Sequence, residues 1–181
     1  LIDYLKNNSK KFPNKIALIC GKESFTYTEL EEKIKRLSYG LTNIGIKKND
    51  HLTVILNNSI EFFFTLYAAA NLGAVIVPAN STLSKKDLIN QIKITNTKYI
   101  IGWHATLKDL FGNKESNFPI KKKNCIVVGN RIKNCKRFGD LMNQLPDNYI
   151  LGKVNFLSNT NFIFGLTSGS TSEPKVIKFS Q

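Results

Sequence analysis

Apolar residues recur at helical spacing in one long segment of the chain, between Thr28 and Gly45. Positions three and four residues apart lie on the same side of a helix, so this spacing predicts one buried face. The apolar positions of that face are Leu30, Ile34, Leu37, Leu41 and Ile44. Thr28 and Glu31 have the spacing of a capping box, and Gly45 suits a left-handed C-terminal cap. The pattern therefore predicts an amphipathic helix that opens at Thr28 and ends before Gly45.

Five other segments show helical spacing together with start or stop signals. Pro13 follows the first segment, and Pro146 follows the last. Gly73 ends the second, and Ser84 with Asp87 has capping-box spacing at the start of the third. The segments are 1–11, 59–73, 84–92, 103–111 and 137–145. Each is predicted to form a helix.

Short apolar runs between these helices have the length and composition of strands. Residues 16–19 and 24–27 flank a turn signal at Gly21 and Lys22, so they are predicted to form a hairpin. The remaining runs are 51–56, 74–77, 98–101 and 125–128. Strands and helices alternate three times within about fifty residues from His51, which is typical of parallel strands joined by right-handed crossovers. We therefore predict an α/β fold with a mostly parallel sheet flanked by helices.

The composition is that of a globular protein with one domain or one large lobe. The chain has 181 residues, of which 42% are hydrophobic and 10% aromatic, so a substantial core can form. No apolar run approaches the roughly 18 to 20 residues that a membrane span needs. The first residues also lack the basic and apolar regions of a secretory signal. These observations favour a cytoplasmic protein without internal repeats or dividing linkers.

The cysteines and histidines do not form a recognisable metal or redox motif. The three cysteines are Cys20, Cys125 and Cys135, and their spacings match neither class. His51 and His104 are the only histidines. We therefore expect reduced, mostly buried thiols and no metal site built from cysteine and histidine.

The net charge is strongly positive, at +13, because 26 lysines and arginines outnumber 13 acidic residues. Such a charge is typical of proteins that contact nucleic-acid phosphates. Arginine, which base readout favours, occurs only at positions 36, 131 and 137, whereas an A/T-rich coding sequence would explain the many Lys, Asn and Ile residues. We therefore do not expect nucleic acid as a partner. A non-catalytic basic α/β module that binds a polyanion or a partner protein stays open as an alternative function.

The end of the chain, residues 161–181, combines two strand-like runs with a stretch of small and hydroxylated residues. The first run ends at Leu166, and the second begins at Val176. Between them lie Thr167, Ser168, Gly169, Ser170, Thr171 and Ser172. Small side chains let backbone N–H groups approach phosphate oxygens, hydroxyls add donors, and the Lys175 ammonium adds a positive charge. The stretch is therefore interpreted as a strand–phosphate loop–strand unit, with an ordinary Ser/Thr/Gly turn as the alternative.

The order of residue types in this stretch resembles the phosphate-loop signature of the adenylate-forming superfamily, usually written Y-T-S-G-T-T-G-x-P-K-G. The matching positions are Thr167, Ser168, Gly169, Thr171, Pro174 and Lys175. Ser170 is a conservative change, whereas Ser172 and Val176 stand where the family has glycine. The stretch differs from the Walker form, in which the lysine directly follows a glycine at the start of a helix.

Segments farther upstream are similar to the opening third of the same superfamily. Residues 25–30, 41–50, 55–61 and 73–80 follow its usual T-Y-x-E-L, G-x-x-x-G-D, P-N-S-x-E and G-A-x-x-x-P-x-N patterns in order and spacing. Asn49 replaces the glycine of the second pattern, and Asn57 replaces the proline of the third. The resemblance implies that residues 1–181 form a single N-terminal lobe of a larger adenylating enzyme. Within it, residues 1–160 would be an α/β layer and residues 161–181 a phosphate-loop hairpin.

Members of this superfamily include acyl-CoA synthetases, which activate a carboxylic acid with ATP to an acyl-adenylate and pass the acyl group to a thiol. The resemblance implies an ATP-dependent, AMP-forming acid–thiol ligase that uses Mg²⁺ and, in the complete enzyme, coenzyme A. Residues 167–172 and Lys175 would bind the ATP phosphates. The family's catalytic groups lie downstream of this loop, so they are expected beyond Gln181. We therefore expect an N-terminal fragment without adenylation activity, either a piece of a longer protein or the product of a shortened reading frame.

Overall fold

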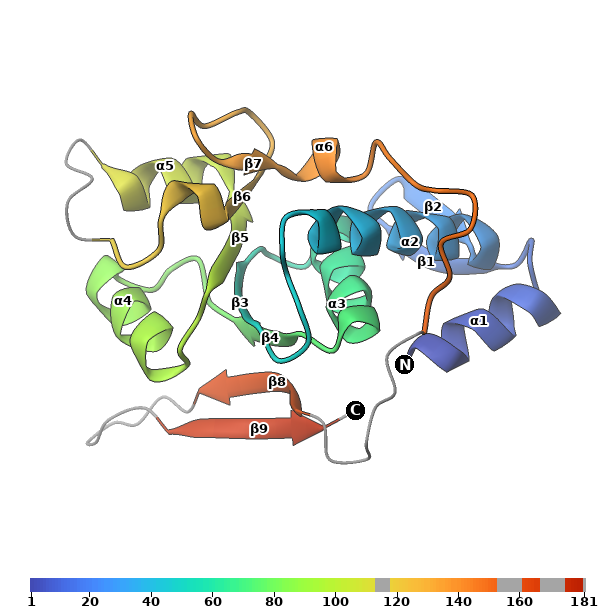
Figure 1. Cartoon of the computed structure of the whole chain (residues 1–181), viewed down its shortest axis with the longest axis horizontal. Helices are drawn as coiled ribbons and strands as arrows, with labels where there is room; N and C mark the ends of the chain where they lie inside the picture. The colour runs from blue at the N-terminus through green and yellow to red at the C-terminus, as the bar shows by residue number, and fades with distance from the viewer. Residues whose placement is uncertain (113–117, 153–160, 167–174, 181) are drawn as a thin grey trace.

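The computed structural model describes residues 1–112, 118–152, 161–166 and 175–180. The helices are α1 (Ile2–Lys11), α2 (Tyr27–Asn43), α3 (Ile60–Leu72), α4 (Lys85–Ile94), α5 (His104–Phe111), the short 3₁₀ helix η2 (Lys122–Asn124) and α6 (Phe138–Leu141). The strands are β1 (Ile16–Cys20), β2 (Glu23–Thr26), β3 (His51–Ile55), β4 (Val75–Pro78), β5 (Tyr99–Trp103), β6 (Cys125–Val128), β7 (Lys136–Arg137), β8 (Asn161–Leu166) and β9 (Val176–Ser180). Figure 1 shows their arrangement in space. None of the described helices is long and apolar enough to cross a membrane.

Within the described residues, seven strands form one sheet, in the order β7-β6-β5-β3-β4-β8-β9. All neighbouring pairs are parallel except β8 and β9, which are antiparallel. Strands β1 and β2 form a separate antiparallel hairpin, with Gly21 in its turn at a φ of +61°. The predicted mostly parallel sheet and the predicted hairpin are both confirmed.

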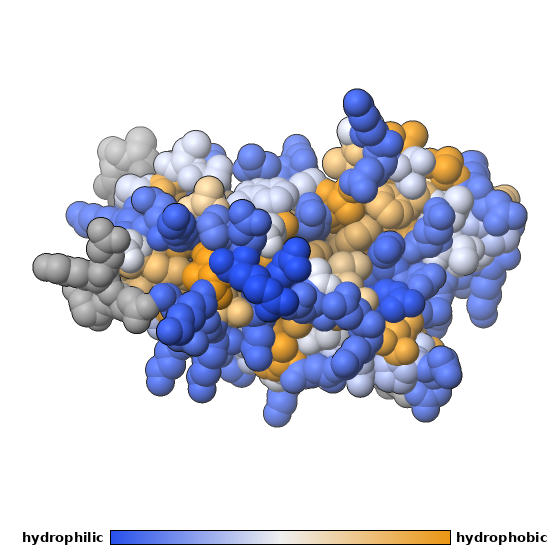
Figure 2. Space-filling view, turned by 90° about the horizontal axis from the view of Figure 1, so that it is seen from above, coloured by the Kyte–Doolittle hydropathy of each residue, from blue (hydrophilic) through white to orange (hydrophobic). Residues whose placement is uncertain are grey.

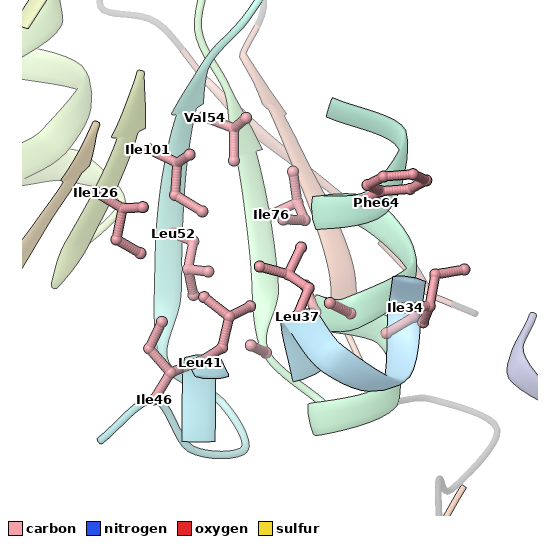
Figure 3. Close-up of a cluster of buried hydrophobic side chains, with 14 of the residues drawn as sticks. Ile34, Leu37, Leu41, Ile46, Leu52, Val54, Phe64, Ile76, Ile101 and Ile126 are labelled. Carbon is pink, nitrogen blue, oxygen red and sulfur yellow. The ribbon is translucent and has the colours of Figure 1, made fainter. Parts of the chain in front are cut away.

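One face of the sheet is covered by α2 and α3, which pack against each other (Figure 1). Figure 3 shows Leu37 and Leu41 of α2 pointing toward the strand side chains Leu52 and Ile76. Most of the apolar face predicted between Leu30 and Leu41 is fully buried in this cluster. Burial of each such side chain contributes roughly 1.5 to 3 kcal/mol, so α2 is held mainly by its packing on the sheet.

The opposite face of the sheet is covered by α4 and α5. Leu88 and Ile92 of α4 and Leu107 of α5 pack in a second buried cluster with Ile100 and Val127. The other predicted helices are present as well, and α3 and α4 begin after the side-chain caps Ser59 and Ser84. The sheet is therefore covered by helices on both faces, as the alternation of strands and helices predicted.

The surface is mostly polar, with exposed apolar side chains at scattered positions. Figure 2 shows one face on which hydrophilic residues predominate and apolar residues gather in separate areas. The most exposed large apolar side chains include Tyr4, Ile19, Ile150 and Phe179. They lie in different parts of the chain, which is ordinary for the surface of a globular protein.

Helix α2 begins two residues earlier than the sequence predicted. Its N-cap is Thr26, whose hydroxyl oxygen accepts a hydrogen bond from the Glu29 backbone N–H at 3.3 Å. The Glu29 carboxylate accepts a hydrogen bond from the Thr26 backbone N–H at 2.8 Å and another from the Thr26 hydroxyl. Both hydrogen bonds lower the pKa of Glu29. Thr28 instead donates its hydroxyl hydrogen to the Pro13 carbonyl oxygen at 3.1 Å. The assignment of Thr28 as the cap was wrong because two Thr-x-x-Glu patterns overlap, and the earlier one forms the cap.

Replacing Thr26 with alanine should lower the free energy of unfolding by about 1 kcal/mol, since the orphan N–H group at the start of α2 loses its acceptor. Thr28→Ala is the matched control. It removes only an exposed hydrogen bond, and it replaces threonine with a better helix former inside the helix. Urea unfolding followed by circular dichroism measures both variants. A loss for Thr28→Ala equal to that for Thr26→Ala would contradict the observed cap.

Helix α6 has four residues, so the prediction of a helix over 137–145 was wrong in length. Gly139 lies inside the segment and lowers its helix propensity. The backbone of Leu141, at the end of α6, lies so close to α2 that only Gly40 leaves room for it. The short helix α6 is therefore held against α2 by this close backbone approach, together with the packing of Phe138 and Leu141 in the first buried cluster.

Candidate functional site

Strands β8 and β9 form the hairpin that was predicted at the end of the chain. Leu166, the last residue of β8, pairs with Val176, the first residue of β9, so the strands hold the two ends of the intervening segment opposite each other. Lys175 is exposed and directly precedes β9. The other predicted site residues lie outside the described ranges: Thr167, Ser168, Gly169, Ser170, Thr171 and Ser172.

The hairpin brings this segment to the edge of the sheet where the parallel strands end. Strand β8 runs parallel to β4, with Ile76 opposite Ile163. The carboxyl end of β8 therefore lies at the same edge as the carboxyl ends of β3, β4, β5 and β6. Ligands of open α/β sheets bind outside the carboxyl ends of the strands. The predicted phosphate loop thus starts at the edge where such a ligand is expected.

The chain leaves β3 and β4 toward opposite faces of the sheet. Helix α3, which follows β3, packs in the first buried cluster, whereas α4, which follows β4, packs in the second. Two neighbouring strands with this property form the topological switch point of a doubly wound sheet, where a crevice opens between their ends. Because β8 is the other neighbour of β4, the segment after Leu166 starts one strand away from this switch point.

Polar side chains surround the switch point. The Ser81 hydroxyl, after β4, donates a hydrogen bond to the Asn57 side-chain oxygen, after β3, at 3.3 Å. The Asn80 side-chain oxygen accepts one from the Thr82 backbone N–H at 3.0 Å. All four residues are exposed, so their amides and hydroxyls are accessible to a ligand. The sequence analysis missed them as site residues, although polar residues directly after two predicted strands were a usable signal.

A cavity of about 370 Å³ lies at the same edge, between the end of β6 and the start of α3. Its charged lining residues are Glu23, Lys33, Glu61 and Arg137. The Arg137 Nε donates a hydrogen bond to the Gly129 carbonyl oxygen at 3.2 Å, which holds the guanidinium at the cavity wall. Because the lining carries both signs of charge, this cavity is less suited to a polyphosphate than the segment before Lys175.

In the part of the chain that the structure describes, protein side chains alone do not form a candidate metal site. No group of three or more His, Cys, Asp or Glu side chains in those ranges is arranged to hold a metal ion. A Mg²⁺ ion bound with a nucleotide usually takes several of its ligands from phosphate oxygens and water. Any such ion would therefore depend on the nucleotide.

Helices cover both faces of a mostly parallel sheet, and the hairpin of β8 and β9 lies beside the switch point of that sheet. This arrangement defines a doubly wound α/β protein, and nucleotide-binding proteins of this class have their site at the switch point. A family model described as "AMP-binding enzyme" matches residues 5–181. The chain therefore belongs to the AMP-binding enzyme family. The resemblance to the adenylate-forming superfamily is confirmed.

Curated relatives include several plant ligases. The chain is 28% identical over 178 residues to 4-coumarate:CoA ligase 1 of Petunia hybrida, a match that covers 97% of this chain and 31% of that protein. It is 36% identical over 103 residues to 4-coumarate–CoA ligase of Vanilla planifolia, covering 56% of this chain and 19% of the relative. The chain thus spans about a third of the length of the first of these relatives.

Solved structures of two enzymes share this fold. The anthranilate CoA ligase AuaEII in complex with anthranoyl-AMP superposes with a TM-score of 0.86 at 19% identity, over 99% of this chain and 34% of that one. The luciferase-like enzyme from the nonluminescent Zophobas morio mealworm gives 0.83 at 21% identity, over 98% of this chain and 41% of that one. These similarities confirm the predicted fold.

Proposed function

We propose that this chain is the N-terminal lobe of an AMP-forming acyl-CoA synthetase or ligase, and that residues 167–172 with Lys175 bind the ATP phosphates. The observation that carries the proposal is the pairing of Leu166 with Val176, at the carboxyl end of a strand next to the switch point. This pairing supports the proposal because both ends of the Ser/Thr/Gly stretch lie at the edge of the sheet where ligands of open α/β sheets bind. The family of the chain and the order of residue types in the stretch support the same role.

The chemistry explains why these residue types suit the reaction. The oxygen of a carboxylate attacks the α-phosphorus of ATP, forms the acyl-adenylate and releases pyrophosphate. The carboxylate is already an anion, so the step needs no general base, and repulsion between two anions is the main obstacle. Backbone N–H groups and hydroxyls of residues 167–171 would hold the β- and γ-phosphates, and Lys175 would neutralise part of their charge. Bound Mg²⁺ supplies further charge neutralisation on the phosphates.

The acyl group would then pass to a thiol, for which coenzyme A is the acceptor suggested by the relatives that are named CoA ligases. Groups for adenine, ribose, the acid and the thiol are expected downstream of Gln181. A cytoplasmic location is part of the same proposal. Because the chain spans 31% of the length of a curated relative, binding and catalysis have to be tested separately.

Hydrogen exchange tests the binding part of the proposal. ATP with Mg²⁺ should protect the backbone amides of residues 161–180 in a saturable manner, because an amide that donates a hydrogen bond to phosphate exchanges more slowly. Inorganic phosphate at the same ionic strength is the control for a non-specific anion effect. No protection by ATP, together with nucleic-acid binding that weakens steeply as salt rises, would instead support the basic module that binds a polyanion.

Pyrophosphate exchange tests the catalytic part. With ATP, Mg²⁺ and a panel of carboxylic acids, this chain alone should show no acid-dependent exchange of labelled pyrophosphate into ATP. The reason is that the groups that position the acid and the α-phosphate are expected outside these residues. Full-length 4-coumarate:CoA ligase serves as the positive control. Acid-dependent exchange above background would overturn the proposal that the lobe is inactive by itself.

A further inference from the structure

Two cysteines that are ten positions apart in sequence meet at the β6–β7 end of the sheet. Ile126 of β6 pairs with Lys136 of β7, so Cys125 and Cys135 occupy the preceding positions on two neighbouring parallel chain segments. Both side chains point to the same face and pack in the second buried cluster. Neighbouring strands are about 4.8 Å apart, which lies within the Cα separation that a disulfide spans.

The two thiols are neighbours in the second buried cluster. The Cys125 thiol donates its hydrogen to the Lys121 carbonyl oxygen at 3.5 Å. The interaction with Cys125 lowers the pKa of Cys135, with a further contribution from the nearby Lys122 ammonium. The interaction with Cys135, together with burial, raises the pKa of Cys125. Cys125 is buried and Cys135 is half-buried, so a reagent in solution reaches Cys135 first. Cys135 therefore has the accessibility and the partner of an attacking thiolate.

We propose that Cys125 and Cys135 form a modification site, at which a small organic disulfide converts the two thiols into a reversible intrachain disulfide. The pairing follows from the register of β6 and β7 and from the packing of both thiols in the second buried cluster. The third cysteine, Cys20, lies on β1 in the separate hairpin and takes no part. The site is independent of the proposed nucleotide function.

The chemistry balances with glutathione disulfide as the oxidant. The Cys135 thiolate attacks one sulfur of the reagent, forms a mixed disulfide and releases one glutathione thiolate. The Cys125 thiol then gives its proton to solvent. Its thiolate attacks the Cys135 sulfur and releases the second glutathione thiolate. Two protein thiols are oxidised, and one small disulfide is reduced to two thiols.

The bridge would fasten β7 to β6 and close the turn between them. Strand β7 has only two residues and leads directly into α6, whose Phe138 and Gly139 line the 370 Å³ cavity. A disulfide across this short loop restricts the unfolded chain and should raise the melting temperature by about 5 °C. The same bridge should slow hydrogen exchange in residues 126–141.

The test is incubation of the folded chain with glutathione disulfide, followed by alkylation of the remaining thiols and peptide mapping. We expect one alkylated cysteine, Cys20, and one cross-linked peptide pair that contains Cys125 and Cys135. Dithiothreitol should restore all three thiols and the original melting temperature. Cys20→Ser should behave like the parent chain, whereas Cys125→Ser and Cys135→Ser should lose the melting shift.

Three results would overturn the proposal. The first is three alkylated cysteines after prolonged oxidation. The second is a glutathione adduct on Cys135 that persists while Cys125 stays reduced. The third is a cross-link through Cys20 in place of the internal bridge. Because Cys125→Ser changes a buried site, the peptide map of the parent chain decides the outcome even if that variant does not fold.

Discussion

Replacing Gly40 with alanine should lower the free energy of unfolding by about 2 kcal/mol. A Cβ atom at this position would lie 2.1 Å from the Leu141 carbonyl oxygen and 2.7 Å from the Leu141 Cβ. Both atoms are too close, and the nearest one belongs to the backbone, so α6 has to move away from α2. Forcing extra atoms into a packed interior costs about 3 kcal/mol here, and the better helix propensity of alanine recovers about 1 kcal/mol.

The matched control for this variant is Gly139→Ala. Gly139 lies in α6, one turn or less from the same contact, and a Cβ atom there would meet nothing within 4 Å. Its stability should therefore stay within about 0.5 kcal/mol of the parent chain. Urea unfolding followed by circular dichroism gives both values. Equal losses for the two variants, or a Gly40→Ala variant as stable as the parent, would show that the backbone contact between α2 and α6 does not form.

Gly40 also illustrates what the sequence could not show. From the sequence, Gly40 was only a residue of low helix propensity inside the predicted helix. The need for glycine at this position comes from the close contact with Leu141, about a hundred positions away in sequence. The apolar face from Leu30 to Leu41 was predictable because its spacing is local and regular. The start of α2 was misplaced because Thr26 and Thr28 both fit the capping pattern, and their other contacts decide between them.

The sequence predicted the residue types of the candidate site but not which other side chains lie at the same edge of the sheet. Lys175 and the Ser/Thr/Gly stretch were identified from their order along the chain. That Leu166, which precedes this stretch, lies at the same edge of the sheet as Asn57 and Asn80 depends on β8 pairing with β4, and no local pattern specifies which strands become neighbours. Exposed asparagines after strands also lack the distinctive order of a motif. Side chains at a switch point therefore became candidates only when the strand order was known.

Replacing Lys175 with glutamine should weaken the binding of ATP with Mg²⁺ about tenfold or more, because a hydrogen bond to a charged phosphate contributes about 1.5 to 3 kcal/mol. Lys175 directly precedes β9, and its neighbour Val176 pairs with Leu166, so its backbone is fixed at the mouth of the predicted loop. The change removes one positive charge and keeps a side chain of similar length. The dissociation constant is measured by calorimetric titration of the folded chain with ATP and Mg²⁺.

The control is Lys178→Gln, which removes the same charge three residues farther along the chain. Lys178 is exposed on β9, and its ammonium lies 5.7 Å from the centre of the Phe164 ring, away from the pairing of Leu166 with Val176. If a specific contact with phosphate is responsible, Lys178→Gln should leave the dissociation constant nearly unchanged at physiological salt, where exposed charges are screened. If both variants weaken binding equally, the general positive charge of the chain attracts ATP and the loop assignment fails. A selective loss in Lys175→Gln instead supports a phosphate held near the carboxyl end of β8, because both variants remove one positive charge and only Lys175 directly precedes the pairing of Val176 with Leu166.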